Sequence, residues 1–176
     1  DFASFAAEHR PVYTAAAIRM NEVLRRYDIR RWLDNYFGTR SQAKYDVIVG
    51  LLLGGANYGV HVHFPDGREE ISPIIGCAHF DEHGIPLIDD REWLPTIIHE
   101  FCHPYVNPAV RKNPEPFHKS AEELLSRTRR QMQAQGYGSW QTLVCESLVR
   151  ASVVRYLQAN HGDSVAEREI ELQKEL

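Results

Sequence analysis

Two histidines and a glutamate with the spacing of a metal-binding motif stand near the middle of the chain. The segment His99-Glu100-Phe101-Cys102-His103 places the histidines four residues apart. On a helix, residues i and i+4 lie on one face about one turn apart, so both imidazoles can bind one zinc ion. Glu100 lies beside them and can take a proton from a metal-bound water without being a ligand. The pattern therefore predicts a zinc-binding helix with His99 and His103 as ligands and Glu100 as general base.

A core helix that carries these residues by chance is the alternative to a metal site. The residues before the motif, 94–98, are mostly apolar, and Phe101 lies within it, as expected for a buried helix. Two imidazoles and a carboxylate on a buried face would cost several kcal/mol unless something paired them. A bound metal ion would provide that pairing, so we favour the metal site.

A catalytic zinc site needs a third protein ligand and an open position for water. We favour Glu146, because it is a carboxylate within an otherwise apolar helical segment. Arg150, one turn further on, could hold this carboxylate beside a metal, or the two residues could form a simple ion pair. The rival third ligands are His118, in a proline-rich segment, and two glutamates that follow it, Glu122 and Glu123.

The negatively charged oxygen that forms during amide hydrolysis needs a hydrogen-bond donor besides the metal. The sequence offers three candidates for this role, Tyr105, Tyr137 and His118. Each of them could instead be a packing residue, and the sequence does not choose between them.

Other histidines lie before the motif. His61 and His63 are two residues apart in a segment that alternates like a strand, so they point to the same side. They could bind a metal, and we favour the alternative that they form an ordinary polar face. His79, Asp81 and His83 form a looser polar cluster in a predicted turn, where a second metal could also bind.

The elements that position these residues are predicted to be mainly helical. We expect N-terminal helices, a small sheet, the motif helix and C-terminal helices, over 1–44, 45–88, 89–104 and 117–176. Within the sheet, 46–53 predicts a buried strand, and 58–80 predicts a hairpin around the turn signal of residues 65–67. The fold class is therefore α+β.

Prolines and aspartates set the expected ends of the motif helix. Asp89 and Asp90 offer an N-cap before it. Pro104 disfavours helical backbone at His103, so we expect the helix to end there and an ordered loop to follow over 104–117.

The composition suits one domain of a globular protein, with 176 residues, 43% hydrophobic and 25% charged. A net charge of −4 without a basic stripe argues against a nucleic-acid partner. No apolar run is long enough to cross a membrane. Three widely spaced cysteines do not predict a disulfide framework. The start at Asp1 shows no secretion signal, but such a signal could have been removed, and we expect the compartment to be extracytoplasmic or secreted.

The motif and its surroundings resemble known metallopeptidases. The two motif histidines with a downstream Glu146 look like the gluzincin branch of zinc metallopeptidases. The segments 96–101, 105–108 and 146–151 resemble a bacterial family catalogued as a domain of unknown function and presumed to be metallopeptidases. The resemblance implies a zincin-like fold over about residues 10–160, with a small sheet beside the motif helix. It also implies His99, His103 and Glu146 as zinc ligands, whereas Arg150 stands where thermolysin-like members have an aspartate.

These observations predict a zinc-dependent hydrolase with one zinc ion and a peptide or protein as substrate. An extended peptide could add to the edge of the 58–80 hairpin. One alternative is a non-catalytic zincin-like binding domain, against which the intact Glu100 argues. The other is a metal-dependent amidohydrolase that acts on a non-peptide substrate.

Overall fold

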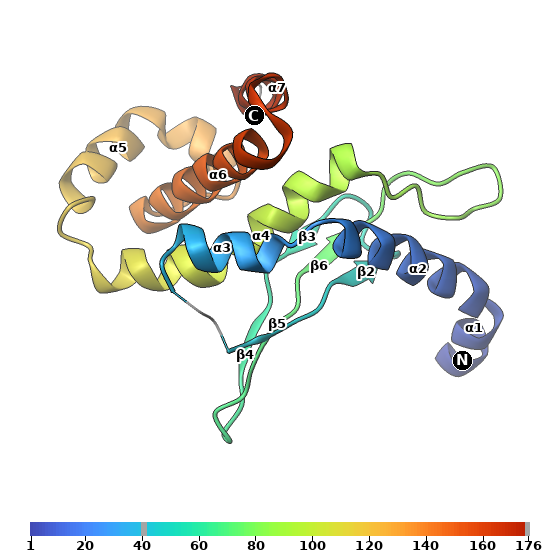
Figure 1. Cartoon of the computed structure of the whole chain (residues 1–176). Helices are drawn as coiled ribbons and strands as arrows, with labels where there is room; N and C mark the ends of the chain where they lie inside the picture. Colours follow the sequence, from blue (N-terminus) through green and yellow to red (C-terminus); the bar gives the residue numbers. More distant parts are fainter. Residues whose placement is uncertain (40–41, 175–176) are drawn as a thin grey trace. The chain divides into compact units, whose positions relative to one another are not determined.

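The computed structural model describes residues 1–39 and 42–174, which form an α+β fold that is mainly helical. This described part contains seven helices and six short strands. Figure 1 traces the course of the chain through them. They divide into two compact units, Asp1–Phe101 and Cys102–Leu176. The division falls inside one continuous helix, α4 (Asp90–Lys112), which carries the motif.

The first unit begins with three helices, α1 (Phe2–Glu8), α2 (Arg10–Arg26) and α3 (Ile29–Tyr36). Local capping explains where two of them start, because the side chains of Asp1 and Asp28 accept hydrogen bonds from backbone N–H groups of the first turn. The apolar face of α2 is buried, as the helical spacing predicts. The described part of the expected helical segment 1–44 thus contains three helices, and its last residue, Lys44, belongs to a strand.

The strands of the described residues form two small sheets that have the same topology. The strands are β1 (Lys44–Tyr45), β2 (Ile48–Gly50), β3 (Asn57–Tyr58), β4 (His61–His63), β5 (Glu69–Ile71) and β6 (Ile74–Gly76). The strand orders are β1-β5-β4 and β2-β6-β3, with the first pair of each sheet parallel and the second antiparallel. Pro73 separates β5 from β6, and it lacks the N–H that a continuous ladder would need.

The predicted hairpin is confirmed as β4 and β5. Its turn contains Gly67 with φ of +85°, a conformation that glycine adopts without strain. The predicted buried strand over 46–53 is wrong. Only β2 is strand, the chain then turns, and Ile48 and Leu52 are 48% and 73% exposed. β2 lies at an edge of its sheet, so this apolar run is not enclosed on both sides.

Helix α4 continues beyond the point where the sequence predicts its end. It runs through Pro104 and Pro108 to Lys112, so the predicted helix end near His103 and the predicted loop from residue 104 are wrong. Pro104 has no N–H to donate to the carbonyl of residue 100, which weakens the helix locally. Burial of the side chains of Val106 and Val110 on the later turns offsets that cost.

The predicted N-cap of α4 is confirmed at Asp89, whose side chain accepts a hydrogen bond of 2.8 Å from the backbone N–H of Arg91. The prediction for the side chain of Asp90 lies outside the part that the structure describes.

The second unit contains the end of α4 and three further helices, α5 (His118–Ala134), α6 (Trp140–His161) and α7 (Asp163–Lys174). The hydroxyl of Ser139 caps α6 by accepting a hydrogen bond from the N–H of Thr142. α6 packs against both α5 and α7 and supplies much of the core. None of the helices in the described residues is both long and apolar enough to cross a bilayer.

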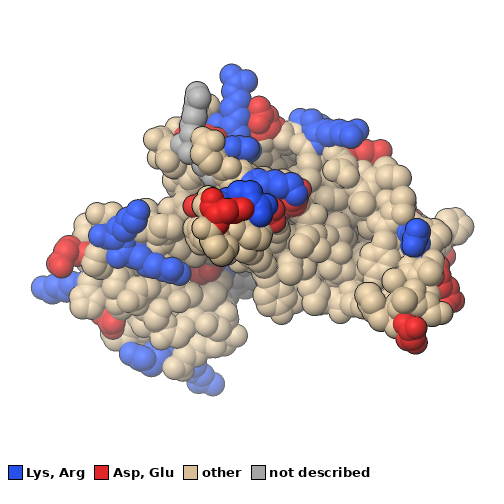
Figure 2. All heavy atoms as spheres, turned by 90° about the horizontal axis from the view of Figure 1, so that it is seen from below, with Lys and Arg blue, Asp and Glu red and all other residues tan. Residues whose placement is uncertain are grey.

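Charged side chains of both signs are interspersed on the face of the molecule in Figure 2, with larger uncharged areas between them.

Candidate metal centre

Helix α4 places both motif histidines one turn apart on the same face. His99 and His103 lie within its continuous helical backbone, as the i, i+4 spacing requires. The neighbouring positions Ile98 and Cys102 are fully buried and anchor this part of the helix. Glu100 is also buried, with 7% of its surface exposed. A buried carboxylate needs hydrogen-bond or charge partners that compensate for the loss of water. A functional carboxylate that is held in place would have such partners.

In the second unit, His103 faces Glu146 of α6. His103 Nε2 lies 3.7 Å from Glu146 Oε1, and the two side chains are 17% and 16% exposed. The other ring nitrogen, Nδ1, lies 3.3 Å from the side-chain oxygen of Asn107, one turn further along α4. An amide oxygen only accepts hydrogen bonds, so this contact is a hydrogen bond in the tautomer that carries its proton on Nδ1. In the neutral ring Nε2 then carries a lone pair that faces a carboxylate oxygen, which is the form in which histidine binds a metal.

The ligand atoms of His99, His103 and Glu146 all lie within 4.8 Å of one another. Two imidazoles and one carboxylate are a donor set used by catalytic zinc sites, where the fourth position is left to water. The distance of 3.7 Å between His103 and Glu146 exceeds that of a hydrogen bond and is close to the separation of about 3.3 Å between two ligands of a tetrahedral zinc ion. The residues present therefore fit a zinc ion.

Tyr137 joins Glu146 to Arg150. The Tyr137 hydroxyl donates to Glu146 Oε2 over 3.4 Å, and Arg150 Nη2 donates to that hydroxyl over 3.1 Å. Arg150 also donates to the side-chain oxygen of Gln135 over 3.4 Å. Arg150 thus reaches the carboxylate through the tyrosine, and the network fixes the orientation of Glu146.

The sequence did not predict two residues that hydrogen-bond to the site. Asn107 contacts His103, and Gln135 contacts Arg150. The spacing of four residues between His103 and Asn107 was the available signal for the first, once the helix is known to continue. Gln135 follows the end of α5 and carries no comparable signal in the sequence.

The rival third ligands lie in other surroundings. The ring of His118 packs edge-on against Trp140, with centroids 5.1 Å apart. Glu123 pairs with Arg127 on the exposed side of α5, and Glu122 is exposed too. None of them belongs to a potential metal-ligand group among the described residues. Tyr105, the remaining oxyanion candidate, is partly buried on α4.

Two cysteines next to the candidate ligands carry free thiols. Burial raises the pKa of Cys102 far above its usual range. Burial also raises the pKa of Cys145, with a further increase from the negative charge of Glu146 and an opposing effect of Arg111. Both side chains therefore stay protonated at neutral pH and behave as small apolar groups.

A small pocket lies in the first unit beside the early turns of α4. It has a volume of about 130 Å³ and is lined by β3, β6 and α4, including Asn57, Trp93 and Thr96. Thr96 precedes His99 by three residues, so both lie on the same side of the helix. Thr96 is thus the lining residue of this pocket that is nearest to the motif along α4.

The chain belongs to the family described as Domain of unknown function (DUF4932), whose model matches residues 1–176. This match confirms the resemblance to a domain-of-unknown-function family, and that description names no activity. No curated protein and no solved structure matches the chain.

Proposed function

We propose that this chain is a zinc-dependent hydrolase, and most simply a peptidase with a zincin-like arrangement. The observation that supports the proposal most directly is the group His99, His103 and Glu146, whose ligand atoms lie within 4.8 Å of one another. The contact of His103 Nδ1 with Asn107 adds to it, because the tautomer that makes this hydrogen bond has an unprotonated Nε2 available for a metal.

The residues around the group have distinct roles in this proposal. A zinc ion held there would lower the pKa of a water molecule and polarise a carbonyl group. Glu100 takes the proton of that water on its carboxylate and passes it to the amine that leaves. Tyr137, held by Arg150, orients Glu146 through the hydroxyl that donates to Oε2.

An extended peptide is the substrate that suits the sheet of the first unit. β3 lies at the edge of the order β2-β6-β3, so one side of it lacks a partner strand within its sheet. Asn57 of β3 also lines the pocket beside α4. Backbone hydrogen bonds to such an edge would hold a peptide in an extended form, and the adjoining pocket would accept one of its side chains.

The test is hydrolysis of a mixed peptide library by the zinc-loaded chain, with products identified by mass spectrometry. Glu100→Gln should keep zinc and lose activity by about 10²- to 10⁴-fold, as expected for removal of a general base. Glu122→Gln is the matched control, because it makes the same chemical change at an exposed site and should leave the rate unchanged. Equal activity of the parent and Glu100→Gln would refute the role of Glu100.

The same experiment separates the alternative functions. Cleavage of small non-peptide amides without cleavage of peptides would support the amidohydrolase. Zinc binding without hydrolysis of either substrate class would support a binding domain.

A further inference from the structure

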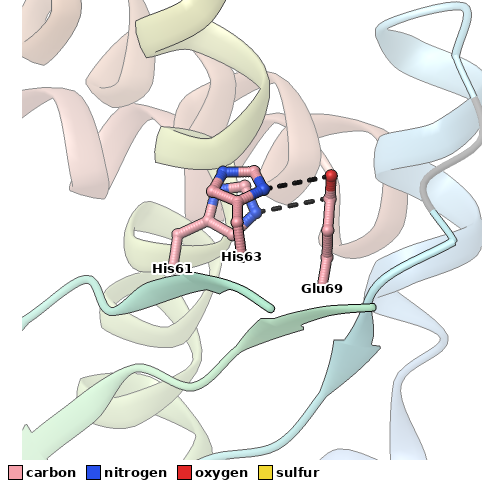
Figure 3. A group of neighbouring side chains, drawn as sticks. All are labelled: His61, His63 and Glu69. Atoms are coloured by element: carbon pink, nitrogen blue, oxygen red, sulfur yellow. Dashed lines mark hydrogen bonds and ion pairs between the residues drawn. The ribbon is translucent and has the colours of Figure 1, made fainter. Parts of the chain in front are cut away.

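The β4–β5 hairpin carries a second group of potential metal ligands, His61, His63 and Glu69. The two histidines are two residues apart on β4, so both project from the same face of the strand. Glu69 of β5 is paired with His63 across the hairpin and therefore projects from that face too. Figure 3 shows the two imidazoles next to each other, both facing the carboxylate of Glu69.

Each imidazole faces its own oxygen of the carboxylate. His61 Nε2 lies 3.4 Å from Glu69 Oε2, and His63 Nδ1 lies 3.2 Å from Glu69 Oε1. Hydrogen bonds from nitrogen to oxygen are most often about 2.9–3.0 Å long, so both distances are long for such bonds. Ligands about 2.0–2.1 Å from a tetrahedral zinc ion are separated by about 3.3 Å, which matches both distances.

The charges of the cluster also suit a cation. The ring centroids of His61 and His63 are only 4.2 Å apart. Without a metal, neutral rings could each donate an N–H to the carboxylate, whereas two positively charged rings would lie side by side and share one negative charge, which is unfavourable. A divalent ion would bind both rings in their neutral form and would be partly neutralised by Glu69.

The cluster is accessible to ions from solvent. The side chains of His61, His63 and Glu69 are 25%, 65% and 41% exposed. An ion can therefore enter without any opening of the fold, and a water molecule can complete its coordination. The hairpin itself projects from the first unit, as Figure 1 shows, and a bound ion would tie its two strands together next to the turn.

We propose that His61, His63 and Glu69 bind one divalent transition-metal ion, with zinc as the best match to two imidazole nitrogens and a carboxylate. His61 binds through Nε2 and His63 through Nδ1, the atoms that face the carboxylate. The ion cross-links β4 to β5 and stiffens the hairpin. This inference uses contacts of the first unit alone and stands independently of the hydrolase proposal.

The first experiment counts zinc ions. Zinc is titrated into metal-free chain carrying Glu146→Ala, with calorimetry and elemental analysis as readouts. We expect about one equivalent to bind, and His61→Ala with His63→Ala in that background to lose it. Two matched controls should keep this zinc ion. Glu70→Gln should keep it, because the residue next to Glu69 on the strand projects from the opposite face. His83→Ala should keep it, because it removes an exposed histidine outside the cluster.

A second experiment needs no substitution in the hairpin. Long-range ¹H–¹⁵N spectra of the Glu146→Ala chain report which imidazole nitrogen binds the ion. Zinc should shift Nε2 of His61 and Nδ1 of His63, while magnesium at the same concentration should shift neither, since it prefers oxygen ligands. Unchanged imidazole spectra, or equal zinc binding with and without the two histidines, would overturn the proposal.

The outcomes separate the two proposals. Loss of one zinc ion on removal of His61 and His63 supports the hairpin site even if the α4 site binds no metal. Loss of one ion on removal of Glu146 alone concerns the α4 site and leaves the hairpin site unaffected.

Discussion

Tyr137→Phe should weaken zinc binding at the α4 site while leaving all three ligands in place. The substitution removes only the hydroxyl that donates to Glu146 Oε2 and accepts from Arg150. Glu146 then loses the hydrogen bond that orients it, and Arg150 keeps its bond to Gln135. The tyrosine ring is replaced by a ring of almost the same volume, so packing should change little.

The magnitude follows from the length of the bond. Removing a hydrogen-bond partner of a metal ligand typically lowers metal affinity by about 10- to 100-fold. The bond from Tyr137 to Glu146 is 3.4 Å, whereas a strong O–H···O bond is about 2.7–2.8 Å, so we expect the lower end of that range. Zinc affinity should fall by about tenfold, or about 1.4 kcal/mol.

Competition with a chromophoric chelator would measure this change. Tyr58→Phe is the matched control, since Tyr58 is exposed on β3 and lies outside the network, and its zinc affinity should equal that of the parent. An affinity of Tyr137→Phe within twofold of the parent would refute the orienting role of the hydroxyl. A loss as large as that of Glu146→Ala would show that the tyrosine does more than orient the carboxylate.

Three further predictions concern stability. In the unfolded chain the thiol of Cys102 loses its proton above about pH 9, whereas in the folded chain the buried thiol keeps it. The free energy of unfolding should therefore fall above that pH by up to ~1.4 kcal/mol per pH unit. Cys102→Ala should reduce this slope in urea titrations. The N–H of Ile85 and the guanidinium of Arg19 hold the pKa of Asp81 below its usual 3.8. The 81–86 loop should therefore lose hydrogen-exchange protection in Asp81→Asn. The parent should lose the same protection as the pH falls through that lowered pKa, because the carboxylate is then protonated. Gly76→Ala should cost about 1–3 kcal/mol in the same urea titrations, because its Cβ would overlap the backbone oxygen of Gly54.

The spacing of residues predicts the local geometry of the motif but not the length of its helix. Residues four apart on a helix share a face, which is why His99 and His103 could be placed together from the sequence. The continuation of α4 past Pro104 depends on the burial of Val106 and Val110 in the folded chain. A local rule about proline cannot include that contribution.

Contacts between distant segments were predictable only in part. Glu146 could be chosen because a carboxylate in an apolar helix needs a partner, and the structure gives it His103 at 3.7 Å. The position of Tyr137 between Glu146 and Arg150 was not predictable, because it depends on how the turn before α6 folds back on that helix. The exposure of Ile48 likewise depends on strand order, which an apolar run does not encode.

We propose that His99, His103 and Glu146 hold one zinc ion. The most direct test is the zinc content and affinity of the chain carrying His61→Ala and His63→Ala, with and without Glu146→Ala. We expect about one tightly bound zinc ion per chain, and an affinity at least 100-fold lower once Glu146 is removed, since loss of a ligand should exceed loss of its hydrogen-bond partner. Zinc retained at equal affinity without Glu146, or no zinc in the chain that keeps Glu146, would contradict the claim.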